Sequence, residues 1–197
     1  RGLGDVYKRQ KFKDQTPPLR FRYCANVYKV KESFAGKRNE VSDCGIELIG
    51  ASSEQSDVEI LLCALEVMEC MKQDTYTLEI GNVNFFHTAV QALGLSDEQQ
   101  EVLADLIDRK SMKELEDYLA MLPLQEADRT FFLRLPWLCG DVSILQEAKK
   151  VCFHEDLSAI LTSLQEVYEQ LKQLGYGDKI TFDFGKLPHL NYYLSLI

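Results

Sequence analysis

The strongest constraint on the fold is a pair of strand-like runs near the start of the chain, separated by a polar loop. Aromatic and β-branched residues dominate the first run, residues 19–30, with the sequence LRFRYCANVYKV. The polar residues 31–39 follow, and a second run over residues 40–49 ends at Gly50. Such runs are typical of β-strands, and their order predicts an antiparallel hairpin with a long loop.

Beyond the hairpin, the spacing of apolar residues changes from two to three or four, which predicts a helix over residues 55–71. The apolar members of this helix share one face: Val58, Leu61, Leu62, Leu65 and Met68. Residues 75–83 then alternate again, with Tyr76, Leu78 and Ile80 on one side. This alternation predicts a half-buried strand.

The middle of the chain carries the start signals of several short helices. Two sequences have the capping-box pattern, Ser96 with Gln99 and Ser111 with Glu114. In this motif each side chain accepts a hydrogen bond from the backbone N–H of the other residue. Gly140, before an aspartate, predicts a further helix start. We interpret this part of the chain as a helical insertion.

Helical spacing returns over residues 157–174 and stops at Gly175, a residue type that commonly ends helices. Residues 179–184, KITFDF, follow as a last strand. The predicted order is therefore a strand hairpin, a helix, a strand, a helical block, a helix and a strand. This order favours an α+β fold with a largely antiparallel sheet.

The charge balance narrows the class of function. The chain of 197 residues has 22 Lys and Arg against 31 Asp and Glu, a formal net charge of −9. Affinity for nucleic acids depends on Lys and Arg that displace counterions from phosphates, so we expect no nucleic-acid partner. Charged residues interrupt every apolar stretch well before the roughly 20 residues that a membrane crossing needs, so we expect no membrane partner either.

The six cysteines form no recognisable metal-binding pattern. They include no CxxC pair and no histidine at ligand spacing, so we expect neither a zinc site nor a disulfide scaffold. Cys63 and Cys70 lie seven residues apart in the predicted helix. We expect both to be small buried hydrophobic side chains, kept reduced in the cytoplasm.

The catalytic motifs of serine hydrolases, P-loop proteins, dinucleotide-binding folds and zinc proteases are absent. The three histidines, His87, His154 and His189, lie far apart in the sequence. We expect each of them to be structural or solvent-exposed rather than a catalytic base. The acidic run over residues 114–117 is expected to be a solvated helix face.

Two carboxylates on the second predicted strand form the most informative group. Asp43 and Glu47 lie four residues apart, so both project from the face of Gly45, which would leave open space between them. Two interpretations remain open: a site for an ammonium or imidazolium group, or the polar outer face of a half-exposed sheet. Tyr192 and Tyr193 could donate hydroxyl hydrogen bonds to the same pocket, although adjacent tyrosines more often serve in packing.

Several separate segments resemble the class II histidyl-tRNA synthetases and their non-catalytic relatives. YCANVYKVKESFAGKRNEVSDCGIELIG is similar to the motif 2 hairpin of this family, and SDVEILLCALEVM to the helix that follows. YTLEIGNVNFF is similar to the next strand, and FDFGKLPHLNYY to the histidine-binding strand and turn. The segments keep the family's order from about Thr16 to Tyr193. The resemblance implies a class II synthetase-like antiparallel sheet flanked by helices, with a helical insertion.

The same resemblance implies that the ATP site of the catalytic members is lost. The synthetase hairpin carries an arginine and a glutamate that bind ATP, and Lys29 and Lys31 stand at those positions here. Lysine lacks the bidentate fork of arginine, and Lys31 reverses the charge of the family's carboxylate. Pro188 stands where the synthetases have an arginine that polarises the histidine carboxylate. Because these donors stabilise the transition state, we expect no aminoacylation and no catalytic residues.

The amino-acid pocket is retained better than the ATP site. Glu47 matches a family glutamate that contacts histidine, and Asp43 stands where the synthetases have glutamine. Tyr192 and Tyr193 match the paired tyrosines of the same pocket. We assign these four residues, together with Lys29, to a histidine-binding site that uses no metal and no cofactor. A histidine pocket without an ATP site resembles the regulatory subunits of ATP phosphoribosyltransferase.

Resemblance to these subunits implies a non-catalytic protein of histidine biosynthesis. It would assemble with the short-form catalytic subunit of ATP phosphoribosyltransferase, be required for that subunit's activity, and transmit feedback inhibition when L-histidine binds. A homodimer within a cytoplasmic hetero-oligomer is expected. Two alternatives remain: a fragment of an active histidyl-tRNA synthetase, and an α+β scaffold that binds no amino acid.

The resemblance also divides the chain into parts. Residues 11–86 correspond to the first part of the synthetase-like core, residues 87–150 to the helical insertion, and residues 151–193 to the second part of the core. Residues 1–10 and 194–197 resemble translated adapter sequence rather than the family. We expect them to be non-native extensions of a gene fragment that is truncated at both ends and lacks the family's motif 1 and motif 3.

Overall fold

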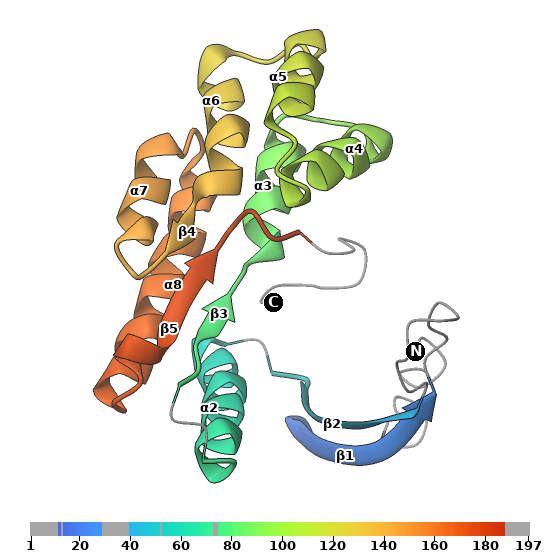
Figure 1. Cartoon of the computed structure of the whole chain (residues 1–197), viewed down its shortest axis with the longest axis vertical. Helices are drawn as coiled ribbons and strands as arrows, with labels where there is room; N and C mark the ends of the chain where they lie inside the picture. Colours follow the sequence, from blue (N-terminus) through green and yellow to red (C-terminus); the bar gives the residue numbers. More distant parts are fainter. Residues whose placement is uncertain (1–11, 13, 29–39, 52, 73–74, 188–197) are drawn as a thin grey trace. The chain divides into compact units, whose positions relative to one another are not determined.

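The computed structural model describes residues 12, 14–28, 40–51, 53–72 and 75–187 (Figure 1). The chain divides into two compact units, residues 1–61 (unit 1) and residues 62–197 (unit 2). None of the helices in the described part combines the length and the apolar character that a membrane crossing requires. The expectations for residues 1–10 and 194–197 concern residues outside the described part.

Unit 1 is built on the predicted antiparallel hairpin. Strand β1 (Leu19–Tyr28) pairs with β2 (Glu40–Ile49), with Leu19 opposite Ile49 and Tyr28 opposite Glu40. The second strand has the predicted bounds, and β1 begins at its predicted first residue. Residues 29 and 30, the last two of the predicted first strand, lie outside the described residues. Because side chains alternate along a strand, the register determines which residues of β1 share a face with each residue of β2.

Helix α2 (Glu54–Cys70) begins in unit 1 and confirms the predicted helix to within one residue at each end. Its first part is tied to the hairpin by Glu59, whose Oε2 accepts a hydrogen bond from Arg20 of β1 at 2.7 Å. This hydrogen bond raises the pKa of Arg20 and lowers the pKa of Glu59. The pair therefore fixes one end of β1 against the first turns of α2.

The prediction that both helical cysteines are buried is wrong. Cys63 is half-buried and Cys70 is exposed. The buried face of α2 carries Val58 and Leu65, which are 9% and 1% exposed. At about 100° per residue, the two cysteines lie roughly 140–160° around the helix from Leu65. Their seven-residue spacing places them on one face of the helix, but on the wrong side for burial.

Unit 2 contains a three-stranded sheet in the order β3 (Leu78–Ile80), β5 (Ile180–Asp183), β4 (Cys139–Gly140). Strand β5 lies in the middle, parallel to β3 and antiparallel to β4. With the hairpin, strand pairing in the described residues is largely antiparallel, as predicted, and the β3–β5 pair is the parallel exception.

Two predictions about these strands need correction. The strand predicted over residues 75–83 is only three residues long, because Val83 already begins a helix that Asn82 caps by accepting the N–H of Phe85 at 3.1 Å. Gly140 does not precede a helix start directly. It pairs with β5, and the next helix begins only at Ile144.

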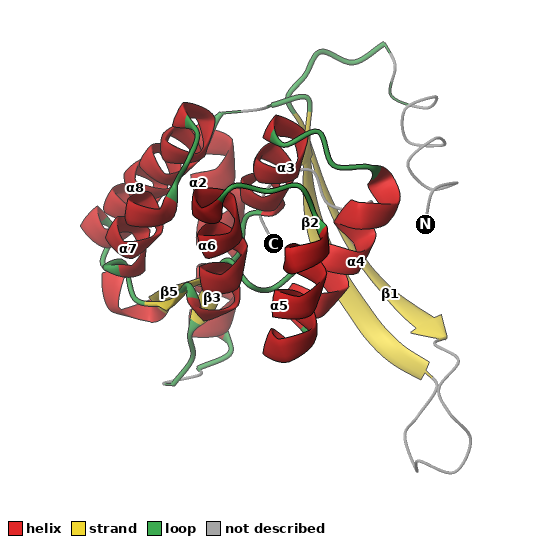
Figure 2. Ribbon diagram, turned by 90° about the horizontal axis from the view of Figure 1, so that it is seen from above, coloured by secondary structure: helices red, strands yellow, loops and turns green. Residues whose placement is uncertain are grey.

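Six further α-helices lie in the described part of unit 2 (Figure 2). They are α3 (Val83–Ala92), α4 (Asp97–Asp108), α5 (Met112–Met121), α6 (Glu126–Arg134), α7 (Ile144–Val151) and α8 (Glu155–Gln173). Helix α8 confirms the predicted helix that stops at Gly175, whose φ is +95°. It packs against α3 and α7. The boundary expected between residues 86 and 87 falls inside α3.

Only one of the two predicted capping boxes forms. Ser96 and Gln99 make both reciprocal hydrogen bonds at the start of α4. The side chain of Ser111 makes no capping hydrogen bond to α5. The backbone N–H of Ser111 donates instead to the carbonyl of Leu106 at 3.0 Å, and the Glu114 carboxylate lies 3.6 Å from the guanidinium of Arg109.

The core of unit 2 is aromatic. Phe85 of α3 lies 4.8 Å from Phe184 and 5.4 Å from Phe131 of α6, measured between ring centroids. Phe86 and Phe132, the next residues of the same two helices, lie 6.1 Å apart. All five rings are at most 2% exposed. They join α3, α6 and the end of β5 into one buried cluster, and so fix the point at which the chain leaves the sheet.

Candidate functional site

Strand β2 holds the two candidate carboxylates on one face of the hairpin. Asp43 lies opposite Ala25 and Glu47 opposite Phe21, and both carboxylate residues are half-buried. Four residues of extended chain separate them by roughly 13 Å between Cα atoms. At this separation, the two groups can contact opposite ends of a small ligand, but they cannot both bind one atom.

The expected open space at Gly45 is not present. Tyr23 lies directly opposite Gly45, and its ring covers the glycine so closely that a Cβ there would lie 2.5 Å from the Tyr23 hydroxyl. An aromatic side chain packed over a cross-strand glycine is a common way to cover the exposed backbone. The space between Asp43 and Glu47 therefore contains a phenol ring, 42% of whose residue surface remains exposed.

Tyr23 is a candidate site residue that sequence reasoning missed. In an antiparallel hairpin, each step forward along one strand is matched by a step back along the other. The predicted strands begin at residue 19 and end at residue 49, so the prediction already implied that Tyr23 lies near Gly45. A phenol between two carboxylates offers one hydroxyl donor and an aromatic face. An imidazole ring can stack on such a face, and its nitrogen can accept a hydrogen bond from the hydroxyl.

The remaining predicted histidine-binding residues, Lys29, Tyr192 and Tyr193, lie outside the described residues. The same is true of Lys31 and Pro188, which carry the argument for a lost ATP site, and of His189. The described structure therefore brings together only Asp43 and Glu47 from the predicted set, on one face of the hairpin.

In unit 2, the segment that leads from β5 to residue 188 is fixed by two carboxylates. Asp183 accepts the N–H of Gly185 at 2.8 Å, and Asp108 at the end of α4 accepts the N–H of Leu187 at 2.9 Å. Gly185 packs so closely on the helical turn at Pro136 that a Cβ would lie 2.8 Å from the Cα of that proline. A larger residue than glycine would not fit here without a backbone shift.

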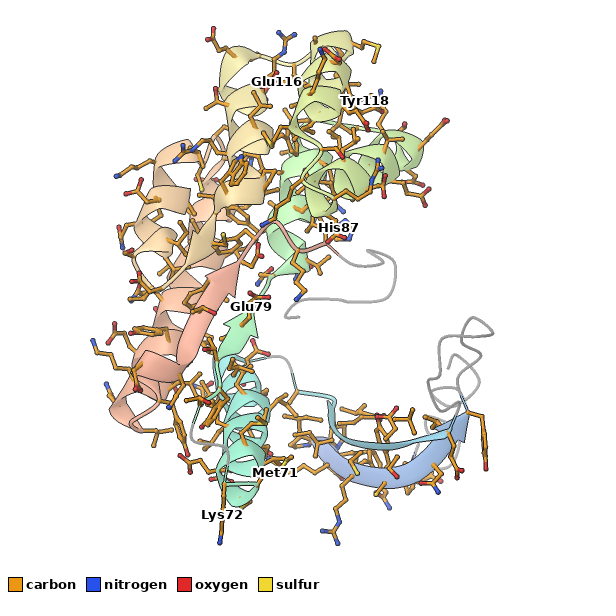
Figure 3. The ribbon with its side chains drawn as sticks, in the orientation of Figure 1. Met71, Lys72, Glu79, His87, Glu116 and Tyr118 are labelled. Atoms are coloured by element: carbon orange, nitrogen blue, oxygen red, sulfur yellow. The ribbon has the colours of Figure 1, made fainter. Side chains whose placement is uncertain are left out.

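A third contact holds the same segment. Lys186 pairs with Glu79 of β3 at 3.0 Å, and this hydrogen bond raises the pKa of the lysine. Figure 3 shows Glu79 on β3 and His87 on the helix that follows. Sequence reasoning missed Asp108 and Glu79 because their partners lie 79 and 107 residues away along the chain. A pattern among neighbouring residues cannot predict contacts between residues so far apart in the sequence.

The two described histidines have structural surroundings, as predicted. His154 is the N-cap of α8, where its Nδ1 accepts the N–H of Asp156 at 3.3 Å. His87 is half-buried on α3, with its ring 6.3 Å from that of Phe86. A pocket of about 550 Å³ lies beside His154, lined by Asn84, Thr88, Gln91, Ala92, His154, Asp156 and Ile160.

Metal ligation has no candidate in the described part of the chain. There, no group of three or more His, Cys, Asp or Glu side chains is placed to hold a metal ion. The acidic run over residues 114–117 forms a solvated helix face, as predicted, around the buried Leu115.

The sequence and the fold match one protein family. The family model described as histidyl-tRNA synthetase matches residues 7–196, and the chain belongs to this family. Within the curated proteins, the chain is 32% identical over 182 residues to the ATP phosphoribosyltransferase regulatory subunit of Bacillus thuringiensis (strain Al Hakam). The match covers 91% of this chain and 43% of that protein. The chain thus spans less than half the length of the curated relatives that it matches.

Solved structures show the same fold. An ATP phosphoribosyltransferase regulatory subunit/histidyl-tRNA synthetase from Bacillus halodurans C matches with a TM-score of 0.84 and 23% identity, over 96% of this chain and 49% of that one. An ATP phosphoribosyl transferase (HisG:HisZ) complex from Thermotoga maritima matches with a TM-score of 0.73 and 16% identity, over 100% and 68% of the two chains. These likenesses confirm the predicted α+β, class II synthetase-like fold.

Proposed function

We propose that this chain is part of a regulatory subunit of ATP phosphoribosyltransferase, a protein of histidine biosynthesis without catalytic activity of its own. The observation that carries the proposal is the 32% identity to proteins of that name over 91% of the chain. The resemblance to the synthetases supports it in a second way. Lys29 and Lys31 stand in place of the arginine and glutamate of the ATP site, and Pro188 stands in place of the arginine that polarises the histidine carboxylate.

The proposed partner is the short-form catalytic subunit of ATP phosphoribosyltransferase. The solved HisG:HisZ complex contains a chain that shares the fold of this protein. In the proposed assembly this chain belongs to a homodimer, supports the activity of the catalytic subunit and lowers that activity when L-histidine binds. A coupling free energy of about 1–3 kcal/mol between the two sites is sufficient for such feedback.

The proposed histidine site uses Glu47 and Asp43 as carboxylates for the ammonium and imidazole groups of the ligand. Tyr192 and Tyr193 add hydroxyl donors, and Lys29 provides a cation for the ligand's carboxylate. Carboxylates on the two sides of an aromatic ring are chemically suited to histidine, which carries nitrogen donors at both ends. The exposed ring of Tyr23 between Asp43 and Glu47 supports this assignment.

Calorimetry with L-histidine tests the site. We expect heat of binding from the unaltered chain and at least about tenfold weaker binding by a Glu47→Gln variant, because a charge-assisted hydrogen bond is worth about 1.5–3 kcal/mol. Glu40→Gln is the matched control. Glu40 lies on the same strand but on the opposite face, where Asn26 donates to it at 3.1 Å. Absence of heat from the unaltered chain would support a scaffold that binds no amino acid.

Two activity assays separate the regulatory role from the synthetase alternative. With a short-form catalytic subunit, we expect added chain to raise phosphoribosyl transfer and L-histidine to reverse that increase. In an ATP–pyrophosphate exchange assay, we expect no histidine-dependent exchange. Robust exchange would contradict the proposal and favour a fragment of an active histidyl-tRNA synthetase.

A further inference from the structure

The hairpin face opposite the candidate carboxylates carries a pair of cysteines. Cys24 of β1 and Cys44 of β2 are direct cross-strand partners, and both are exposed. Cys44 donates its S–H to the sulfur of Cys24, with the two Sγ atoms 3.0 Å apart. Both are free thiols in this structure.

The backbone of the hairpin already has the geometry that a disulfide needs. Directly opposite residues of an antiparallel pair have Cα atoms about 4.5 or 5.5 Å apart, depending on whether they form a hydrogen-bonded pair. Both distances lie within the range of about 4.4–6.8 Å found for disulfides. Closing the sulfur separation from 3.0 Å to a bond of about 2.05 Å is therefore compatible with the Cα spacing of directly opposite strand residues.

We propose that Cys24 and Cys44 form a reversible cross-strand disulfide by exchange with a low-molecular-weight disulfide such as oxidised glutathione. This site does not depend on histidine binding. The cysteine pattern argues against a scaffold in which several disulfides hold the fold together. The proposed bond is different, because it joins one exposed pair of cysteines on a hairpin that forms without the bond.

The exchange balances in two steps. The thiolate of one cysteine attacks a sulfur of oxidised glutathione, forms a mixed disulfide and expels one glutathione thiolate. The second cysteine, as its thiolate, then attacks the protein sulfur of that mixed disulfide and expels the second glutathione thiolate. The two protons lost by the cysteines are taken up by the two glutathione thiolates, so the protein is oxidised by two electrons and glutathione is reduced.

The order of attack follows from the hydrogen bond. Donation of its S–H to Cys24 raises the pKa of Cys44, and the neighbouring carboxylate of Asp43 contributes in the same direction. Cys44 therefore keeps its proton more readily than an ordinary thiol, which makes it the poorer first nucleophile of the pair. Cys24 is accordingly the first nucleophile, and Cys44 resolves the mixed disulfide.

The test is redox equilibration of the whole chain in glutathione buffers, followed by alkylation, tryptic digestion and mass spectrometry. Trypsin cleaves the connecting loop after its lysines and arginine, but it leaves Cys44 on one peptide with Cys63 and Cys70. A second digestion with a glutamate-specific protease, which cleaves after Glu47, separates Cys44 from them, so that the peptides carrying Cys24 and Cys44 remain joined only through their own disulfide. We expect this linked product at a lower ratio of oxidised to reduced glutathione than any other link among the six cysteines. Added reduced glutathione should restore both thiols.

Matched variants separate the pair from general thiol reactivity. In Cys44→Ser, we expect a glutathione adduct on Cys24 and no linked peptide, whereas Cys63→Ser and Cys70→Ser should leave the link unchanged. Far-UV circular dichroism of each variant checks that the fold is kept. Full alkylation of both hairpin cysteines in the most oxidising buffer would overturn the proposal, as would disulfides formed only between molecules.

Discussion

Unit 1 and unit 2 both pair strands in defined registers, but they bury very different amounts of side chain. Among the described residues of unit 1, Val58 is the most buried hydrophobic side chain at 9% exposure, and Tyr28 of the hairpin is 75% exposed. Unit 2 contains a connected core in which the largest side chains are at most 2% exposed. The comparison shows that backbone pairing can define the geometry of a site where little apolar burial is available to stabilise it.

The largest expected effect comes from removing a core ring of unit 2. Phe131→Ala removes a fully buried side chain that contacts Phe85, Phe132 and Phe153. We expect the free energy of unfolding to fall by about 3–5 kcal/mol, because the cavity lies among rigid aromatic neighbours. Urea denaturation followed by circular dichroism measures this change.

The matching substitution in unit 1 is Phe21→Ala. Phe21 is half-buried and its described ring contact is with Phe12, at 4.8 Å between centroids. We expect a loss of about 1 kcal/mol or less, since little apolar surface returns to water. Equal losses in the free energy of unfolding for Phe21→Ala and Phe131→Ala would contradict the difference in burial between the two units.

The next largest effect concerns the two helix starts with the same sequence pattern. Ser96→Ala removes a hydroxyl that accepts the N–H of Gln99 at 3.3 Å, and we expect a loss of about 1 kcal/mol in thermal or urea unfolding. Ser111→Ala is the control. Because the Ser111 side chain makes no capping hydrogen bond, its removal should cost only a few tenths of a kcal/mol. A larger loss for Ser111→Ala would contradict the observed caps.

A local effect is expected where the chain leaves β5. Asp108→Ala removes the acceptor of the Leu187 N–H, so we expect hydrogen exchange of that amide to accelerate roughly fivefold, corresponding to about 1 kcal/mol. Asp108→Asn keeps a side-chain acceptor and should show a smaller change. Exchange in the hairpin of unit 1 should be unaffected, and a change there would show that the two units open together.

The smallest effect is the pH dependence of the Arg20–Glu59 pair in unit 1. Because the arginine lowers the pKa of Glu59 in the folded chain, the pair stabilises the fold above the ordinary glutamate pKa of 4.5. This contribution is lost as the pH falls through 4.5 towards the lower folded value. We expect Glu59→Gln to lower the melting temperature slightly at neutral pH. The difference should vanish in acid, and a constant difference would contradict the linkage.

Much of the fold could be predicted because its signals are local. The alternation of residues 40–49 and the three- and four-residue spacing of residues 157–174 each follow from which side of one element is apolar. Sequence spacing likewise placed Asp43 and Glu47 on one face of a strand. None of these inferences required knowledge of a distant part of the chain.

The predictions that were wrong concern residues whose local structure depends on contacts with another part of the chain. The predicted box at Ser111 is missing because the N–H of Ser111 already donates to the carbonyl of Leu106, a residue of the preceding helix. Gly140 joins a sheet because β5, some forty residues later, is available to pair with it. We predicted open space at Gly45 because the residue pattern of one strand does not show which side chain of the neighbouring strand lies opposite it. Tyr23 occupies that space.

The sequence by itself determined the family, the order of most strands and helices, and the shared face of the two carboxylates. These follow from short-range periodicity and from motifs that are read along the chain. Only the tertiary structure decided that a phenol ring separates those carboxylates, that Cys24 and Cys44 meet across the hairpin, and that Asp108 holds the chain beyond β5. Each of these depends on register or packing between residues far apart in sequence, which hydrogen-bond pairing and burial select only when the whole chain folds.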